Sequence, residues 1–427
     1  MAYRIKYFLI ALLSVSCSTN NLFAQKTNNL VNAINEQLIP LKTVSDELDF
    51  MDFAPLNAIL KDKQVIALGE ATHGTHEFFL YKQRMLAYLV KQQGVKTIVL
   101  EADFSGSQVM NDYLINGKGT AAQCLLGMGF YGVSQEFLDL VHWLKSYNDT
   151  QSTENKVSLY GCDMQYPVFA ANKIKDYLLQ KNLLTSDLKA GFDAMNKYYP
   201  GLTKNEKMAI HNTIANLSAL KFEDPDVAKN PLYERDLRLL QQFIGLTDSQ
   251  SKLYGSKAAI RDQYMAENCD WIYNYTKQNK MMLWEHNQHI SKSKNNSGQV
   301  PMGNFLADTL KDKYYAIGFD FYKGKMRSFD VTSMKKVDVE LPQAKDGSSG
   351  AIFAQCSAPN FILDFKTAVV NPIVSEFLNT KLQSSAYGAD FKEGQAPFYI
   401  KHKLMESYDA IIFIKETSPA TDMKSAN

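Results

Sequence analysis

A carboxylate and an imidazole stand three residues apart in a turn flanked by glycines, at Glu70 and His73. Histidine titrates near neutral pH. A neighbouring carboxylate fixes its tautomer and stabilises the imidazolium that forms when the ring takes a proton from water. The pair therefore has the composition of a general base. Because a single Glu or His after a strand is more often a helix cap or a surface residue, this hypothesis needs matching groups from other segments.

The sequence around this turn predicts that it joins a strand to a helix. Residues 64–68 form a short apolar run of strand length that ends at Gly69, and residues 75–93 carry one apolar stripe of helical period. In open α/β sheets, ligands bind in the crevice beyond the carboxyl ends of the strands. We therefore expect Glu70 and His73 to lie at such a crevice.

The same pattern recurs along the chain. Three more predicted strands lead into ionisable residues: 96–100 before Glu101, 157–161 before Asp163, and 281–284 before His286 and His289. Further strands are predicted at 315–321, 361–364 and 410–414. Strands separated by helices are almost always parallel, so their carboxyl ends meet at one edge. The sequence predicts an α/β fold whose central, mainly parallel sheet is flanked by helices and carries these groups at one edge.

Residues 169–280 have helical character throughout, with spaced apolar positions and charged residues between them. This insertion leaves the sheet at the edge that carries the ionisable groups. We expect it to roof the cleft. The alternative is that its helices pack on one face of the sheet.

Two chemistries fit the collected residues. No Gly-x-Ser-x-Gly elbow supplies a serine nucleophile, so direct attack by an activated water is the simplest hydrolytic mechanism. Carboxylates with histidines also form zinc and iron sites, and His286-x-x-His289 has a common ligand spacing. The residue inventory does not separate these alternatives.

Composition excludes some classes of function. Lys plus Arg number 46 against 45 Asp plus Glu, and this balance argues against a nucleic-acid partner. Scattered cysteines, which lack metal-ligand spacing, are predicted to be small buried residues: Cys124, Cys162, Cys269 and Cys356.

Residues 1–24 are predicted to be a signal peptide, with Arg4 and Lys6 before an apolar run and Ala24 at the cleavage site. Cys17 ends an imperfect lipoprotein box, so a lipid anchor is the alternative. Either outcome places residues 25–427 beyond the inner membrane, in the periplasm or anchored to a membrane. No later apolar run approaches the roughly 18 residues that span a bilayer.

Several motifs together resemble those of the erythromycin esterases. They are Gly69-Glu-Ala-Thr-His-Gly74, then Glu101, then Trp284-Glu-His-Asn-Gln-His289, and finally Val300-Pro-Met-Gly303 and Tyr408-Asp-Ala-Ile-Ile-Phe413. The resemblance runs from about residue 40 to 415, with the motifs in the same order and at similar spacing.

The resemblance implies hydrolysis of the lactone ester of a 14-membered macrolide antibiotic, with no metal or other cofactor required. It implies that His73 is the base and that Glu70 or Glu101 orients it. His286 and His289 would then hydrogen-bond the lactone carbonyl or the leaving alkoxide.

Four further residues are predicted to bind the substrate. Some members of the family carry an arginine where this chain has Lys82, and Arg84 follows two residues later. We predict Lys82, Arg84, Asp163 and His76 as substrate-binding residues.

The alternatives to a macrolide esterase are an esterase of the same mechanism that acts on another ester, and an exported protein that binds a metal or haem through the same histidines. The oligomeric state is not predicted.

Overall fold

A computed structural model describes residues 25–42, 49–125, 128–129, 134–197, 201–219, 230–248, 254–295, 298–395 and 397–423. The predicted signal peptide and Cys17 lie outside the described residues. The four predicted buried cysteines are buried and carry free thiols, as expected. Within the described ranges, none of the helices has the length and apolar character needed to cross a bilayer.

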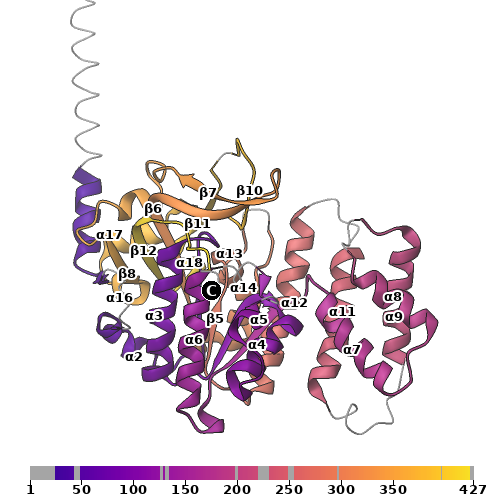
Figure 1. The fold of residues 1–427 in the computed structure, drawn as a ribbon. Helices are drawn as coiled ribbons and strands as arrows, with labels where there is room; N and C mark the ends of the chain where they lie inside the picture. Colours follow the sequence, from indigo (N-terminus) through magenta and orange to yellow (C-terminus); the bar gives the residue numbers. More distant parts are fainter. Residues whose placement is uncertain are drawn as a thin grey trace, which may run out of the picture.

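A ten-stranded sheet forms the centre of the molecule (Figure 1). Eight strands lie side by side in the order β1 (Ile39–Pro40), β8 (Asn360–Asp364), β12 (Ala410–Thr417), β6 (Tyr314–Asp330), β2 (Val65–Leu68), β5 (Met281–Trp284), β3 (Thr97–Asp103) and β4 (Ser158–Asp163). The strands from β12 to β4 are mutually parallel, whereas β8 runs antiparallel to β12 and β1 antiparallel to β8. The predicted α/β class is confirmed, and each predicted strand is present.

Two features of the sheet were not predicted. β6 extends beyond the body, where β7 (Lys335–Leu341) pairs antiparallel with it and β10 (Asp390–Phe391) pairs parallel. β9 (Lys381–Ser385) and β11 (Tyr399–Lys403) form a separate antiparallel pair.

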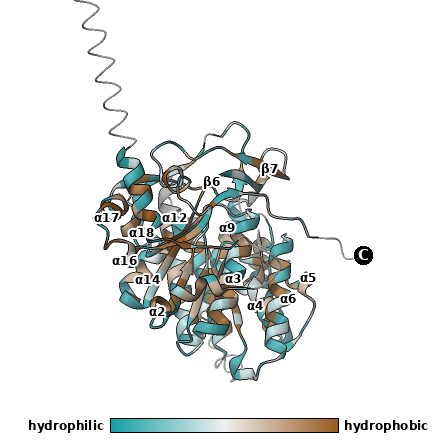
Figure 2. Cartoon of the chain, turned by 90° about the vertical axis from the view of Figure 1, so that its left-hand side faces the viewer, coloured by the Kyte–Doolittle hydropathy of each residue, from teal (hydrophilic) through white to brown (hydrophobic). Residues whose placement is uncertain are grey.

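Helices cover both faces of the sheet because each buried strand has two apolar faces. In β2, Ile66 and Leu68 enter one hydrophobic core while Val65 and Ala67 enter the other. Figure 2 shows the resulting hydrophobic centre beneath more hydrophilic outer surfaces.

The two cores are closed by different helices. Helices that contribute to the first core are η1 (Met51–Leu56), α2 (Asn57–Leu60), α3 (His76–Gln93), α5 (Ala121–Leu125) and α6 (Gln135–Asp149). Those that contribute to the second include α14 (Met302–Leu310), α15 (Ser349–Phe353), α16 (Phe365–Ala368) and α17 (Pro372–Leu378). α4 (Phe104–Asn116) packs against β4 and contributes to both. Short helices complete the chain: η3 (Thr153–Asn155), α13 (Asn287–Ile290), η5 (Lys311–Lys313) and α18 (Leu404–Ser407), with a further helix over residues 25–35.

The helical insertion contains α7 (Val168–Gln180), α8 (Ser186–Met195), α9 (Lys204–Ala219), α11 (Pro231–Asp248) and α12 (Tyr254–Tyr275). The first four helices form a bundle with its own hydrophobic core, which stands to the side of the main body in Figure 1. α12 packs against β4 and α14 and thereby joins this bundle to the sheet.

Gly74 in the turn after β2 is a point of close backbone approach. Its carbonyl accepts hydrogen bonds from the amides of Arg327, on β6, and Ala420, near the C-terminus. A Cβ at this position would lie 1.8 Å from the carbonyl oxygen of Arg327. Glycine is therefore required here by packing, because any larger residue must displace β6 from the turn.

We expect Gly74→Ala to lower the free energy of unfolding by about 1–3 kcal/mol, since the added methyl group overpacks a backbone contact. Chemical denaturation measures this loss. Gly201→Ala is the matched control, because a Cβ at Gly201 meets no atom within 4 Å. Equal stability of the two variants would contradict the conclusion that packing requires glycine at position 74.

Candidate functional site

The carboxyl ends of three neighbouring strands bring the site together. β5 lies between β2 and β3, and Leu68, Trp284 and Leu100 share one row of the sheet. The residues that follow these three therefore project from adjacent strand ends. The turn after β2 supplies Glu70 and His73, the end of β3 supplies Glu101, and the segment after β5 supplies His286 and His289.

His73 is held by a buried carboxylate. Its Nδ1 lies 2.7 Å from Oε1 of Glu70, and the other carboxylate oxygen of Glu70 accepts from Nζ of Lys82 at 2.5 Å and from the Trp284 indole at 3.2 Å. Glu70 is 2% exposed and Lys82 is 0% exposed. Because Nδ1 donates to Glu70, the proton-accepting nitrogen of the neutral ring is Nε2.

The charges of this group perturb its titration. Burial raises the pKa of Glu70. The charges and hydrogen bonds of Lys82 and His73 lower it by more, so the pKa lies below its ordinary value. Burial lowers the pKa of His73, but the negative charges of Glu101 and Glu70 outweigh it and leave the pKa raised above 6.5. The pKa of Lys82 is lowered by burial despite its carboxylate partner. The result is a histidine with increased basicity at the end of β2.

Glu101 joins the histidines to the helical insertion. It lies in β3 where the pairing with β4 is irregular. Its Oε2 accepts from the backbone amide of His286 at 3.0 Å, and its Oε1 lies 2.9 Å from Nη2 of Arg261 and 3.1 Å from Nε2 of His289. Burial raises the pKa of this carboxyl group, but the positive charges around it hold the pKa well below its usual range.

Arg261 and His289 form the cationic side of the site. The Arg261 guanidinium also binds Asp163 through two of its nitrogens, and Nδ1 of His289 lies 2.7 Å from Asp262. Burial lowers the pKa of His289, but Glu101 and Asp262 outweigh this effect and raise it well above 6.5. The raised pKa favours a positively charged ring whose Nε2 donates to Glu101, although Nη1 of Arg261 also lies 3.0 Å from this nitrogen.

His286 has the opposite character. Its Nε2 lies 3.0 Å from the carbonyl oxygen of Tyr387, and its Nδ1 accepts from the backbone amide of Gln288 at 3.3 Å. Burial and the nearby His73 lower the pKa of His286 to about 4. Its ring lies 5.0 Å from that of His73, centroid to centroid. His286 is therefore a neutral ring that packs beside the base with both nitrogens engaged by the backbone.

These groups line a cleft of about 970 Å³, which is at the upper end of the range for small-molecule sites. Its described lining includes His73, Glu101, Arg261, His286 and His289. From the insertion, only α12 contributes to this lining, through Arg261 and Asp262. Further walls come from the loop after α13, from β7 and from residues 386–402, together with Gln165, Tyr166, Met326, Ser407 and Tyr408.

None of the four predicted substrate-binding residues is among the described residues that line the cleft, and their part in substrate binding stays a prediction. Lys82 instead holds Glu70, and Asp163 holds Arg261. Arg84 binds Asp52 and packs on the ring of Phe53. The Nδ1 of His76 lies 2.6 Å from Oε1 of Glu136. These residues position their neighbours.

Sequence reasoning missed Arg261 and Asp262. They lie about 100 residues beyond β4, in a helix that carries three other charged residues, Lys257, Glu267 and Asp270. Their spacing contains no signal that separates them from those residues. Only the packing of α12 against β4 reveals their role.

In the described ranges, no group of three or more His, Cys, Asp or Glu side chains is arranged to hold a metal ion. Nδ1 of His73 and both ring nitrogens of His286 and of His289 already face carboxylates or backbone groups.

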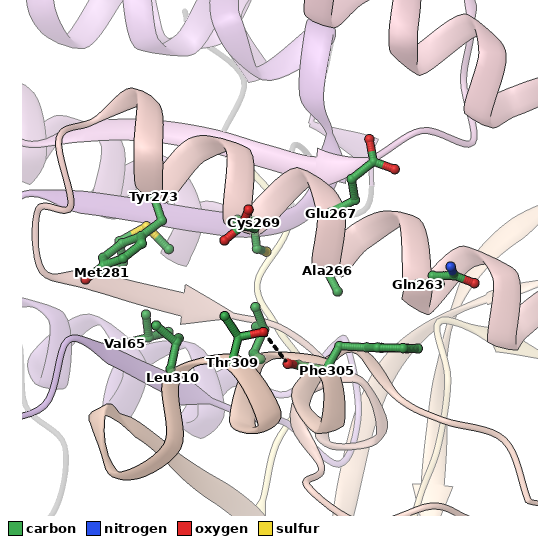
Figure 3. Close-up of a pocket in the computed structure, with 12 residues that line it drawn as sticks. Val65, Gln263, Ala266, Glu267, Cys269, Tyr273, Met281, Phe305, Thr309 and Leu310 are labelled. Atoms are coloured by element: carbon green, nitrogen blue, oxygen red, sulfur yellow. Dashed lines mark hydrogen bonds between the residues drawn. The ribbon is translucent and has the colours of Figure 1, made fainter.

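A second, smaller cavity of about 220 Å³ lies between α12 and α14 (Figure 3). Its lining residues include Ala266, Phe305 and Leu310, and the residues of the Glu70–His73 group are not among them. The larger cleft is therefore the candidate active site.

Comparisons with known proteins indicate the same family that the sequence motifs resemble. A model of the family described as erythromycin esterase matches residues 90–417. Erythromycin esterase type II of Escherichia coli is 23% identical, over 90% of this chain and 97% of that protein. A putative hydrolase, YbfO, of Bacillus subtilis (strain 168) is 25% identical, over 87% of this chain and 88% of that protein.

Two solved structures share the fold. A succinoglycan biosynthesis protein has a TM-score of 0.79 at 24% identity and covers 92% of this chain and 98% of its own. An erythromycin esterase EreC mutant in its open conformation has a TM-score of 0.62 at 20% identity and covers 88% of this chain and 96% of its own.

We expect Lys82→Met to lower the free energy of unfolding by about 3–5 kcal/mol at neutral pH, because it leaves the buried Glu70 carboxylate without its cation. Denaturant titration measures the loss. Lys175→Met is the control, since it removes a more exposed ion pair, with Asp193, that contributes about 1 kcal/mol or less. The double variant Glu70→Gln/Lys82→Met should recover part of the stability. A loss no larger than that of the control would show that the buried pair is unimportant.

Proposed function

The chain belongs to the erythromycin esterase family, and on that premise we propose that it hydrolyses the lactone ester of 14-membered macrolide antibiotics with a water activated by His73. The observation that supports this proposal most directly is the buried Glu70–His73 pair at the wall of a large cleft. The pKa of His73 is raised by two carboxylates, as a general base near neutral pH requires.

In the proposed reaction, Nε2 of His73 takes a proton from water as the water oxygen attacks the lactone carbonyl carbon. A tetrahedral intermediate forms, and its collapse breaks the bond between the acyl carbon and the ring oxygen. The imidazolium returns its proton to the leaving alkoxide. The product is a linear hydroxy acid, and water is the only other reactant. Glu70 is a positioning residue that stabilises the imidazolium during this cycle.

Negative charge on the carbonyl oxygen requires a nearby cation or donor. His289 and Arg261 are the best candidates, because both line the cleft and both carry positive charge. His286 is less suitable, because burial lowers its pKa to about 4 and its ring is therefore neutral near pH 7. We therefore assign His286 to packing against His73 and assign charge stabilisation to His289 and Arg261.

Linearising a macrolide would abolish its action as an antibiotic, so the proposed role is macrolide resistance. The proposed location is the periplasm or a lipid-anchored position, in line with the signal predicted in residues 1–24.

We expect His73→Asn to lower kcat by at least ~10²-fold with the fold intact, because it removes the proton acceptor. Mass spectrometry of erythromycin after incubation measures the addition of one water. His211→Asn is the control, since His211 lies in α9 and is not among the described residues that line the cleft. Near-normal hydrolysis by His73→Asn would remove this residue from the mechanism.

The raised pKa of His73 also predicts a pH dependence. The base acts only when neutral, so kcat/KM should rise with pH through a midpoint above 6.5. Glu101→Gln removes a charge that raises this pKa. We therefore expect the variant to shift the midpoint to lower pH and to depress kcat at saturating substrate.

Rate measurements from pH 5 to 9 test both effects. Glu267→Gln is the control, because Glu267 lies on α12 and binds Arg235 and Arg238. An effect of Glu101→Gln confined to KM, with an unmoved midpoint, would reassign Glu101 to substrate binding.

A further inference from the structure

A second hydrogen-bonded chain reaches the cleft and is not used by the proposed mechanism. It consists of four serines, one histidine and one buried carboxyl group. Its links are Asp320 Oδ2 to Ser349 Oγ at 2.5 Å, Ser349 to Ser384 at 2.8 Å, Ser384 to His402 Nε2 at 2.9 Å, His402 Nδ1 to Ser407 at 2.8 Å, and Ser407 to Ser293 at 2.8 Å. Six separate segments of the fold contribute one residue each.

Most of this chain is inaccessible to solvent. Asp320 is 1% exposed, and Ser349 and Ser407 are 0% exposed. Burial lowers the pKa of His402 to about 4, so its ring is neutral near pH 7. A neutral imidazole has one donor nitrogen and one acceptor nitrogen. The ring can therefore carry the donor-to-acceptor direction of the hydrogen bonds from one side of the chain to the other.

Proton counting determines that direction. Burial raises the pKa of Asp320 to about 7. When this carboxyl group is ionised, Ser349 donates its one hydroxyl proton to it, so Ser384 must donate to Ser349. The Ser384 proton is then used, and Nε2 of His402 must be the donor to Ser384. Nδ1 of His402 consequently accepts from Ser407.

The same count of hydroxyl protons assigns the donors and acceptors at the cleft end of the chain. Ser407 has used its proton on His402, so Ser293 donates to Ser407. The remaining capacity of Ser293 Oγ is that of an acceptor. Ser293 is partly exposed and lines the cleft, as do Ser291, His402 and Ser407. His289 stands only four residues earlier, so this end of the chain lies on the segment that follows the cationic side of the site.

We propose that Ser293 is a specificity-determining subsite that accepts a hydrogen bond from a hydroxyl group of the substrate, oriented by the chain from Asp320 through His402 and Ser407. This inference rests on the proposed function, since it concerns the substrate of the same cleft. It adds that the preferred esters are hydroxylated. A hydroxyl-free ester makes no such contact.

Binding measurements on the His73→Asn background separate recognition from turnover. The two probes are erythromycin, which carries hydroxyl groups, and an unsubstituted 14-membered lactone, which carries none. The quantity measured is the ratio of their dissociation constants. We expect Ser293→Ala to reduce the preference for the hydroxylated lactone about 3–10-fold, the effect of one neutral hydrogen bond.

Ser407→Ala is the second variant. It removes the acceptor for the Ser293 proton, leaves Ser293 in place, and should reduce the preference in the same direction. Ser105→Ala is the matched control. Ser105 is also a buried serine that donates to an aspartate, Asp236, at 2.6 Å, but it is not among the described residues that line the cleft. This control should not change the preference.

An unchanged preference in both Ser293→Ala and Ser407→Ala would overturn the subsite, as would failure of the His73→Asn protein to bind erythromycin. A preference that depends on both serines, in a protein whose unaltered form does not hydrolyse erythromycin, would support the subsite and overturn the proposed function. The Ser293 subsite and the proposed function would therefore be contradicted by different results.

Discussion

The buried Glu70 carboxylate is the interaction on which the site depends. It is enclosed at the end of β2 and contacts a lysine ammonium, an indole N–H and the imidazole of His73. A buried carboxylate without a cation is costly, so Lys82 must be present for Glu70 to remain charged. Only a charged Glu70 both fixes the tautomer of His73 and raises its basicity. The side chain that performs the proposed chemistry is therefore supported by a salt bridge that solvent does not reach.

Glu101 extends this support across the sheet. Its two oxygens contact the backbone of His286, the ring of His289 and the guanidinium of Arg261. Because Arg261 belongs to α12, the position of the helical insertion is coupled to the electrostatics of the site. Asp163 at the end of β4 binds the same guanidinium. Four parallel strands and one inserted helix thus meet in one network of charges.

The three site histidines show how environment divides one residue type into three roles. Carboxylates raise the pKa of His73 and raise that of His289 further, whereas burial and the neighbouring His73 lower that of His286 to about 4. Groups whose environments push their pKa values apart are suited to different tasks. The base, the cation and the neutral packing ring lie within one cleft.

Much of the fold followed from the sequence alone, because it rests on local signals. Apolar runs of strand length identified seven strands, and helical periodicity identified α3 and the insertion. The grouping of Glu70, His73, Glu101, His286 and His289 also followed, since residues after parallel strands meet at one sheet edge. Motif spacing was sufficient to recognise the family.

Tertiary structure decided the rest, because those contacts join residues that are distant in the chain. Sequence order does not reveal that β5 lies between β2 and β3, that α12 delivers Arg261, or that Arg84 faces Asp52 and not the cleft. The individual roles of the histidines were likewise invisible, since a pKa is determined by burial and by neighbouring charges. Residue type and spacing determined which groups could do chemistry here, and packing in three dimensions determined the charge that each one carries.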